Sequence, residues 1–284
     1  MHLPTDISKP FFSYGIFKPG QLGYYRIENY VENKKISCYV NHRLLTRDGL
    51  PIIHDTIGGS TEGALLEFKD GKEKKAYQGI VDIEPDHHYK WGTINVTANR
   101  EKEISANVLY GKSPEKGSTP TDYGNYDGKK DPLFNDALDL IREIIDKSRG
   151  FNSEVKKIFE LQMAYMLLWT VLERYTTLRY ELNQTPMERI YQLKDDPNFC
   201  KVLKEVVERK RTVFRSDNPR TRVILDPNKP KNAINYYYQI RSNIVHRGKA
   251  IYNDYDKLFL SINELLTITE ATIMRAFNLS ETEQ

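Results

Sequence analysis

Three side chains within six residues, Arg241, Asn243 and His246, could together cleave a phosphodiester bond. A guanidinium binds phosphate oxygens through a planar pair of N–H donors, and an imidazole exchanges protons near neutral pH. Asn243 lies three residues before His246, so on a helix the two share a face and the amide can fix the tautomer of the ring. Arg241 lies about 140° away from His246 around a helix that turns about 100° per residue. Its long side chain, or a second copy of the motif across a dimer, would bring both groups to one phosphate.

The same residues also have a purely structural interpretation. In a buried helix, Arg241 would pair with an acidic neighbour, and His246 would cap the last turn before Gly248. The residue types and spacing of the pair do not by themselves decide between the two interpretations.

Residues 241–248, RSNIVHRG, resemble the Arg-x4-His signature of HEPN domains, above all its Apea-like branch. Residues 159–178 resemble the long aromatic-rich helix that precedes this signature, and Arg247, between His246 and Gly248, is a small departure. The resemblance covers about residues 132–284. It implies an all-α bundle, a homodimer, and metal-independent cleavage of RNA with no cofactor, as in many toxins and antiviral defence effectors. His246 would then transfer the proton, Arg241 would offset the charge on the phosphate, and Asn243 would orient the ring.

Positive charge is concentrated just before this motif. Residues 201–231 contain ten Lys or Arg against four Asp or Glu, a surplus of +6, whereas the whole chain has +3. Such a stretch beside a phosphodiester site would help to capture RNA, although a solvated helix followed by a charged loop explains it equally well. The candidate RNA-binding residues are Lys210, Arg211, Arg215, Arg220, Arg222 and Arg247.

Length and composition indicate a soluble protein of two ordinary domains. The chain has 284 residues, of which 29% are charged, and its mean hydropathy is −0.62. No apolar run approaches the roughly 20 residues needed to span a bilayer, and the first residues lack the layout of a secretion signal. Cys38 and Cys200 fall in different expected domains without a partner motif. We therefore expect a cytoplasmic protein with no zinc site and no membrane partner.

The two halves of the chain differ in periodicity. Residues 11–110 hold short segments rich in β-branched and aromatic residues, with strands expected at 12–14, 36–40, 63–68, 77–83 and 93–96. Residues 111–131 are rich in turn formers and predict a linker. From residue 132 the apolar period is helical, with helices expected near 132–145, 153–182, 186–193, 199–210, 231–247 and 255–277 and an irregular insertion at 213–229. The fold class is α+β: a mostly β domain (1–110), a linker (111–131) and a helical bundle (132–284).

The segment Tyr14-Gly15-Ile16-Phe17-Lys18-Pro19-Gly20 resembles the opening strand and loop of gamma-glutamyl cyclotransferase-like (AIG2-like) proteins, and further matches continue to about residue 100. The resemblance implies a barrel-like domain in which backbone N–H groups of residues 14–17 hold a carboxylate. It also implies that Glu84 takes a proton from an attacking amine and passes it to the leaving amine. Because the attack is intramolecular, no cofactor is required.

Two departures leave the role of this domain open. Ile16 stands where the family often has a small hydroxyl residue and would narrow the pocket, and Glu84 follows Asp82 by two residues instead of three. The domain could release 5-oxoproline from gamma-glutamyl compounds, bind a small-molecule or protein trigger, or be purely structural. Glu84, His87 and His88 match no metal-ligand spacing, so we expect no metal.

The sequence therefore predicts an endoribonuclease with a cyclotransferase-like domain that binds a ligand or regulates it. One alternative is a cyclotransferase whose helical half serves dimerisation. The other is a non-catalytic scaffold that binds RNA or protein.

Overall fold

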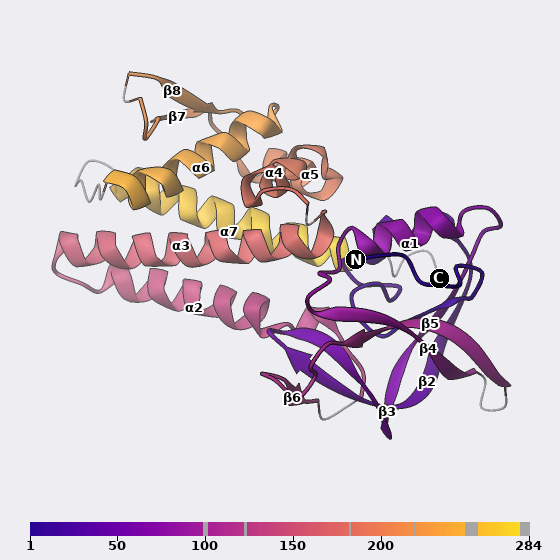
Figure 1. The fold of residues 1–284 in the computed structure, drawn as a ribbon. Coiled ribbons are helices and arrows are strands. Elements are labelled where there is room, and N and C mark those ends of the chain that lie inside the picture. Colours follow the sequence, from indigo (N-terminus) through magenta and orange to yellow (C-terminus); the bar gives the residue numbers. More distant parts are fainter. Residues whose placement is uncertain (99–101, 122–123, 182, 219, 248–254, 279–284) are drawn as a thin grey trace. The chain divides into compact units, whose positions relative to one another are not determined.

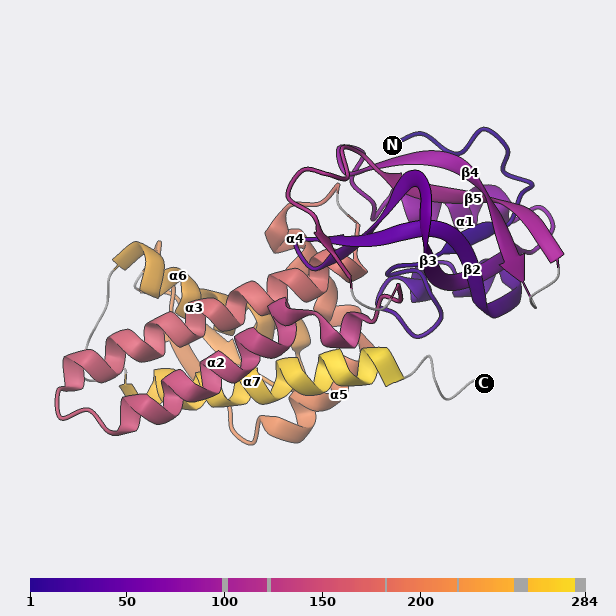
Figure 2. The same ribbon diagram turned by 90° about the horizontal axis from the view of Figure 1, so that it is seen from below.

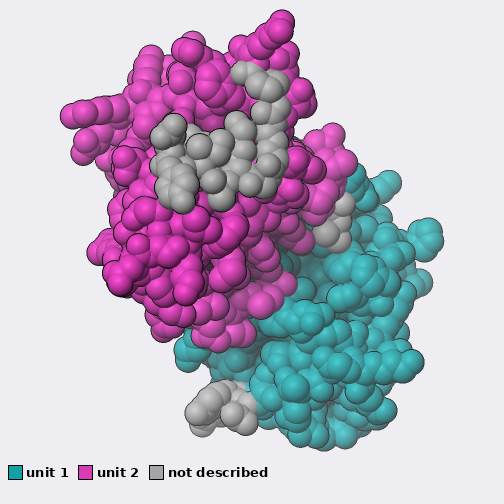
Figure 3. Space-filling view, turned by 90° about the vertical axis from the view of Figure 1, so that its left-hand side faces the viewer, with its two compact units in different colours: residues 1–131, 178–183, 277–284 teal, residues 132–177, 184–276 magenta. Residues whose placement is uncertain are grey.

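The computed structural model describes residues 1–284 except 99–101, 122–123, 182, 219, 248–254 and 279–284 (Figure 1). The chain forms two compact units (Figure 3). Unit 1 contains residues 1–131, 178–183 and 277–284, and unit 2 contains residues 132–177 and 184–276.

Unit 1 is built around a closed barrel of five strands: β1 (Phe11–Ser13), β2 (Val31–Arg47), β3 (Leu50–Phe68), β4 (Tyr89–Ala98) and β5 (Lys102–Gly111). Neighbours follow the order β1-β3-β5-β4-β2, and β2 pairs back with β3, which closes the barrel. The two-residue β6 (Thr119–Pro120) pairs antiparallel with the end of β2. Helix α1 (Glu73–Val81) connects β3 to β4, while η1 (Tyr24–Arg26) and η2 (Glu28–Tyr30) connect β1 to β2.

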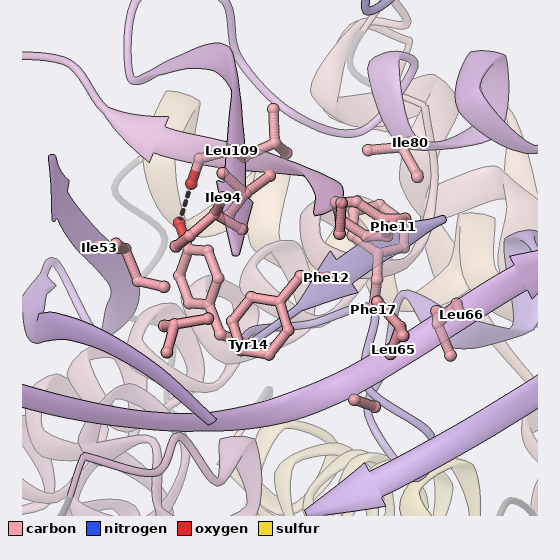
Figure 4. Packing of buried hydrophobic residues seen from close by; sticks show 14 of the residues in the cluster. Phe11, Phe12, Tyr14, Phe17, Ile53, Leu65, Leu66, Ile80, Ile94 and Leu109 are labelled. Carbon is pink, nitrogen blue, oxygen red and sulfur yellow. Dashed lines mark hydrogen bonds between the residues drawn. The ribbon is translucent and has the colours of Figure 1, made fainter. Parts of the chain in front are cut away.

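The long β2–β3 hairpin has a clear cause in the sequence. Arg47 pairs with Leu50, so Asp48 and Gly49 form a two-residue turn. Both have positive φ, 51° and 74°, which is the requirement of the hairpin turn that an Asp-Gly pair favours. The barrel interior is filled by buried aromatic and aliphatic side chains, including Phe11, Phe12 and Leu65 (Figure 4).

Two expectations for the first half of the chain differ from the structure. The strand expected at 77–83 is the end of helix α1, because Ala76, Tyr77 and Ile80 bury one helical face against the barrel core. The β-branched and aromatic composition of this segment is outweighed by that packing. The expected linker at 111–131 belongs to unit 1: β6 pairs with β2, and Lys18 donates a hydrogen bond of 2.7 Å to the carbonyl of the buried Tyr126.

Unit 2 is mainly helical. It contains α2 (Pro132–Arg149), most of α3 (Glu154–Arg179), α4 (Pro186–Tyr191), η4 (Gln192–Asp195), α5 (Pro197–Val206), α6 (Pro230–Arg247) and most of α7 (Tyr255–Asn278). The long helices α2, α3 and α7 lie side by side in both ribbon views (Figures 1 and 2). Buried tyrosines link the bundle, as where the Tyr165 hydroxyl donates to the Tyr237 carbonyl at 2.8 Å. Within the described parts of the chain, no helix is long and apolar enough to cross a membrane.

The α+β class, a barrel followed by a helical part, is as predicted, but unit 2 is not all-α. Strands β7 (Arg211–Phe214) and β8 (Arg222–Leu225) form an antiparallel hairpin across part of the expected irregular insertion. Val213, Val223 and Leu225 are buried, and Phe214 and Ile224 between them are exposed. Each strand has four residues, which is too short for the alternation to stand out in the sequence.

Candidate functional site

Helix α6 carries Arg241, Asn243 and His246 near its end. Arg241 is half-buried, and its Nε is fully buried with no hydrogen-bond partner. Over the part of the chain that the structure describes, no acidic side chain forms an ion pair with it. His246 is exposed to solvent. The acidic neighbour that a purely structural arginine would have is therefore missing from the described residues.

The Asn243 side chain differs from the expectation. Its amide nitrogen donates to the Phe214 carbonyl at 2.9 Å, and its Oδ1 is buried without a partner. The amide thus ties α6 to β7, and between these described side chains the expected hydrogen bond to the imidazole of His246 is not formed. Helical spacing correctly places Asn243 and His246 on one helix, but it could not reveal that a strand competes for the amide.

A cavity of about 70 Å³ opens beside the motif. Its wall is mainly apolar, with Ile240 and Ile244 of α6, Phe214 of β7 and Leu258 of α7. Its polar groups come from Gln162, Asn243 and Lys257. A site of this kind, apolar with a few converging polar groups, is the usual form of a ligand pocket.

Among the described candidate RNA-binding residues, three form ion pairs with acids and two do not. Lys210 pairs with Asp226 at 2.8 Å, Arg215 pairs with Asp217, and Arg211 forms a bidentate pair with the buried Glu264. Arg211 is therefore part of the core connection between β7 and α7, which corrects the expectation that it meets RNA. Arg220 and Arg222 are exposed. The Arg247 side chain lies outside the described residues.

In unit 1 the residues singled out by the cyclotransferase resemblance come together. Tyr14, Gly15, Ile16 and Phe17 follow β1, and with Glu84 they line one pocket together with Pro51 and Tyr89. Glu84 lies just beyond α1, where its backbone N–H still donates to the Ile80 carbonyl at 3.0 Å. Burial raises the pKa of the Glu84 carboxyl from 4.5 to about 8, so the group is mostly protonated at pH 7.

Hydrogen bonds and close packing hold the walls of this pocket. The Tyr14 hydroxyl donates to the Leu109 carbonyl (Figure 4), and the Tyr89 hydroxyl donates to the Pro51 carbonyl at 2.9 Å. A Cβ at Gly15 would lie 2.7 Å from Cγ of Pro51, so only glycine fits there. Burial also raises the pKa of both tyrosines, which therefore stay neutral hydrogen-bond donors.

The pocket is small. Its cavity volume is about 20 Å³, which is room for about one water molecule. The Ile16 side chain is 6% exposed and lies in the wall, in agreement with the expectation that it narrows the space. A gamma-glutamyl group would enter only after this loop moved.

Other features of the expected sites can be placed directly. His87 is exposed and His88 half-buried in the turn before β4, and the described residues contain no group of three or more His, Cys, Asp or Glu side chains that could hold a metal ion. Sequence reasoning missed Ser216, Gln239 and Ser242, which connect the β7–β8 hairpin to α6; no local pattern marks them. No family model, curated protein or solved structure matches this chain.

Proposed function

We propose that the protein is an endoribonuclease whose active groups are Arg241 and His246 on α6. The observation that carries the proposal is the half-buried guanidinium of Arg241, which forms no ion pair with any acid among the described residues and whose Nε has no partner. A partly desolvated cation without a counter-charge is unfavourable, and a bound phosphate would supply that charge. His246 lies about 1.4 helical turns away, exposed and able to meet a polymer.

The reaction follows from these two groups. The 2′-oxygen of a ribose attacks the adjacent phosphorus, and the bond from phosphorus to the 5′-oxygen breaks. The products are a 2′,3′-cyclic phosphate and a free 5′-hydroxyl. His246 transfers a proton during this exchange, and Arg241 stabilises the charge that develops on the phosphorane oxygens. DNA lacks the 2′-hydroxyl, so the substrate class follows from the chemistry.

A homodimer is part of the proposal, because it brings an Arg241 and a His246 from different copies to one phosphate. Cavity-lining residues Gln162 of α3 and Ile244 of α6 are each followed by an exposed apolar residue, Met163 and Val245. These side chains are 56% and 47% exposed. Burial of such side chains against a second copy would stabilise a dimer.

The direct test compares the wild type with Arg241→Ala and His246→Ala on RNA in the presence of EDTA. Both variants are expected to lose at least about 100-fold in cleavage rate, the size of effect typical of a lost proton-transfer group. Arg142→Ala is the matched control, because Arg142 is paired with Glu270 elsewhere in unit 2. Equal cleavage by all four proteins would refute the proposal, as would products without a cyclic phosphate end.

A second candidate function is acid–base catalysis at Glu84 in unit 1. The observation that favours it is the convergence of residues 14–17 and Tyr89 on a carboxyl whose pKa is raised to about 8. In this chemistry the amine of a gamma-glutamyl group attacks its own amide carbon, the amide C–N bond breaks, and 5-oxoproline and a free amine are released. Glu84 would carry the proton from one nitrogen to the other. The cavity of about 20 Å³ places this function second.

The second function has a separate test. Release of 5-oxoproline from a gamma-glutamyl dipeptide should be abolished by Glu84→Gln and increased by Ile16→Thr, which enlarges the pocket. No release by either the wild type or Ile16→Thr would exclude it.

A further inference from the structure

The outer face of the β7–β8 hairpin combines an aromatic ring with a guanidinium. Phe214 and Arg222 are cross-strand partners, and the Arg222 guanidinium lies 5.3 Å from the centre of the Phe214 ring. Phe214 is 40% exposed, and Ile224 on the same face is 48% exposed. Arg222 and Arg220 are exposed, with no ion pair to any described residue.

This face is held rigidly from behind. Val213, Val223 and Leu225 are buried on the inner side of the hairpin. The Arg211 guanidinium forms its bidentate pair with Glu264 of α7 from the same side. A stacking surface on such a support loses little conformational freedom when a ligand binds.

The hairpin is also attached to the turn of α6 that carries Arg241. The Asn243 amide donates to the Phe214 carbonyl at 2.9 Å. Beyond the strand, the Ser216 backbone N–H donates to Oε1 of Gln239 at 3.2 Å, and the Ser216 and Ser242 hydroxyls are 2.7 Å apart. These contacts hold the backbone that carries the exposed ring next to the motif.

We propose that this face, Phe214 with Arg220, Arg222 and Ile224, is a binding platform for single-stranded RNA. A base stacks on the Phe214 ring. This stacking increases the affinity for RNA by about one to two orders of magnitude, and it requires a base that is not paired in a duplex. The two arginines bind the flanking phosphates. This inference rests on the proposed function, since it names the form of RNA that the α6 site receives.

Charge around the hairpin supports an anionic polymer as the occupant. Of the four acids in residues 201–231, Asp217 and Asp226 are paired with Arg215 and Lys210, and Glu205 is paired with Arg275. Their charge is largely compensated locally, which leaves the exposed Arg220 and Arg222 to face solvent. An acidic peptide would share the charge but not the preference for an aromatic stacking partner.

The test measures binding in the His246→Ala background, so that the RNA stays intact. A short labelled single-stranded RNA containing 2-aminopurine reports affinity by anisotropy and stacking by fluorescence quenching. Phe214→Leu keeps the apolar bulk and removes the π face, so it is expected to weaken binding about tenfold and abolish the quenching. Tyr39→Leu, an exposed aromatic of β2 in unit 1, is the matched control and is expected to bind as the parent does. Thermal unfolding of each variant checks that the fold is retained.

The outcomes are separable. Unchanged affinity and quenching in Phe214→Leu overturn the platform, and so does a poly-aspartate peptide that binds with the same dependence on Phe214. If Phe214→Leu binds normally while Arg241→Ala abolishes cleavage, the platform is wrong and the nuclease proposal stands. If Phe214→Leu loses binding while Arg241→Ala still cleaves, the platform stands and the nuclease proposal is wrong.

Discussion

Arg211 and Arg241 are both half-buried guanidinium groups of unit 2, but they differ in whether an acidic side chain lies beside them. Arg211 lies between the buried Glu264 and the ring of Tyr236, and hydrogen bonding to these neighbours raises the pKa of its guanidinium. The Nε of both guanidiniums is buried without a hydrogen-bond partner, but Arg241 forms no ion pair with any acid among the described residues. The first is a structural group and the second is a group available to a ligand. Sequence reasoning grouped Arg211 with the RNA-binding residues because its charge is visible in the sequence and its partner, 53 residues away, is not.

Arg211→Met is expected to lower the free energy of unfolding by roughly 3 kcal/mol, because it leaves the Glu264 carboxylate buried without its counter-charge. Chemical denaturation measures the change. Arg222→Met removes a neighbouring exposed guanidinium and serves as the control, with an expected change below about 0.5 kcal/mol. Equal losses in the two variants would show that Arg211 has no special structural role.

Glu84 makes stability depend on pH. Its pKa is raised from 4.5 to about 8 in the folded protein, so between these values the unfolded chain loses a proton that the folded protein keeps. The stabilisation is complete below pH 4.5 and is lost as pH rises towards 8, with a slope of at most about 1.4 kcal/mol per pH unit. Glu84→Gln removes this dependence and should gain stability relative to the wild type between pH 5 and 8. Thermal melts across this range measure it.

The exposed Glu103→Gln on β5 is the control for this measurement, and its stability should follow that of the wild type. A constant difference between Glu84→Gln and the wild type at every pH would contradict the raised pKa.

At the scale of elements, local chemistry predicted the helices of unit 2 well, but it predicted neither helix α1 nor the β7–β8 hairpin. Helix starts are marked by capping residues, such as Asp196, whose carboxylate accepts from the N–H of Asn198 at 2.9 Å at the start of α5. The β2–β3 turn is marked by its Asp-Gly pair. The β7–β8 hairpin and helix α1 form because their apolar side chains are buried against residues far away in the sequence, so their local residue patterns do not predict them.

The site was predictable to a similar extent. The positions of residues 14–17 and Glu84 in one pocket were expected from the resemblance, and the structure brings them together. The small volume of this cavity could not be predicted from the sequence, because it depends on how Ile16 packs. The hydrogen bond from Asn243 to Phe214 could not be predicted either, because it joins residues 29 positions apart in the sequence.

The capping box of α4 gives a test of local stability. Thr185 accepts from the Glu188 N–H at 3.3 Å, and Glu188 accepts from the Thr185 N–H at 2.8 Å. Thr185→Ala removes one of these bonds and should reduce the protection of α4 amides from hydrogen exchange by about 1 kcal/mol. Thr267→Ala, in the interior of α7, is expected to leave α4 exchange unchanged. Identical exchange in both variants would mean that the cap does not limit local opening.

At the scale of the whole molecule, each unit is assembled from separate parts of the chain. Residues 178–183 belong to unit 1, where the Arg179 guanidinium lies 4.1 Å from the Tyr25 ring and Glu181 pairs with Arg26 at 2.8 Å. Deleting residues 1–110 would remove the partners of both. A regulatory role of unit 1 is therefore better tested with point variants in the intact chain.

If a ligand bound in the unit 1 pocket triggers the proposed nuclease, Glu84→Gln should separate two activities. Growth arrest on expression should be reduced, because the variant pocket can no longer ionise or exchange a proton with the trigger. Cleavage of RNA by the purified protein without a trigger should remain at the wild-type rate, since Arg241 and His246 are unchanged. Growth arrest equal to that of the wild type would show that the pocket does not trigger the proposed activity.

The assembly of unit 1 from separate segments of the chain has a consequence for biosynthesis. Phe277 is 1% exposed, and its ring lies 3.3 Å from where a Cβ on Gly128 would stand. Translation delivers this ring only after the whole helical segment from residue 184 to residue 276. A nascent chain that stops within that segment has a barrel without this aromatic neighbour, so synthesis of unit 2 must come before unit 1 can be completed.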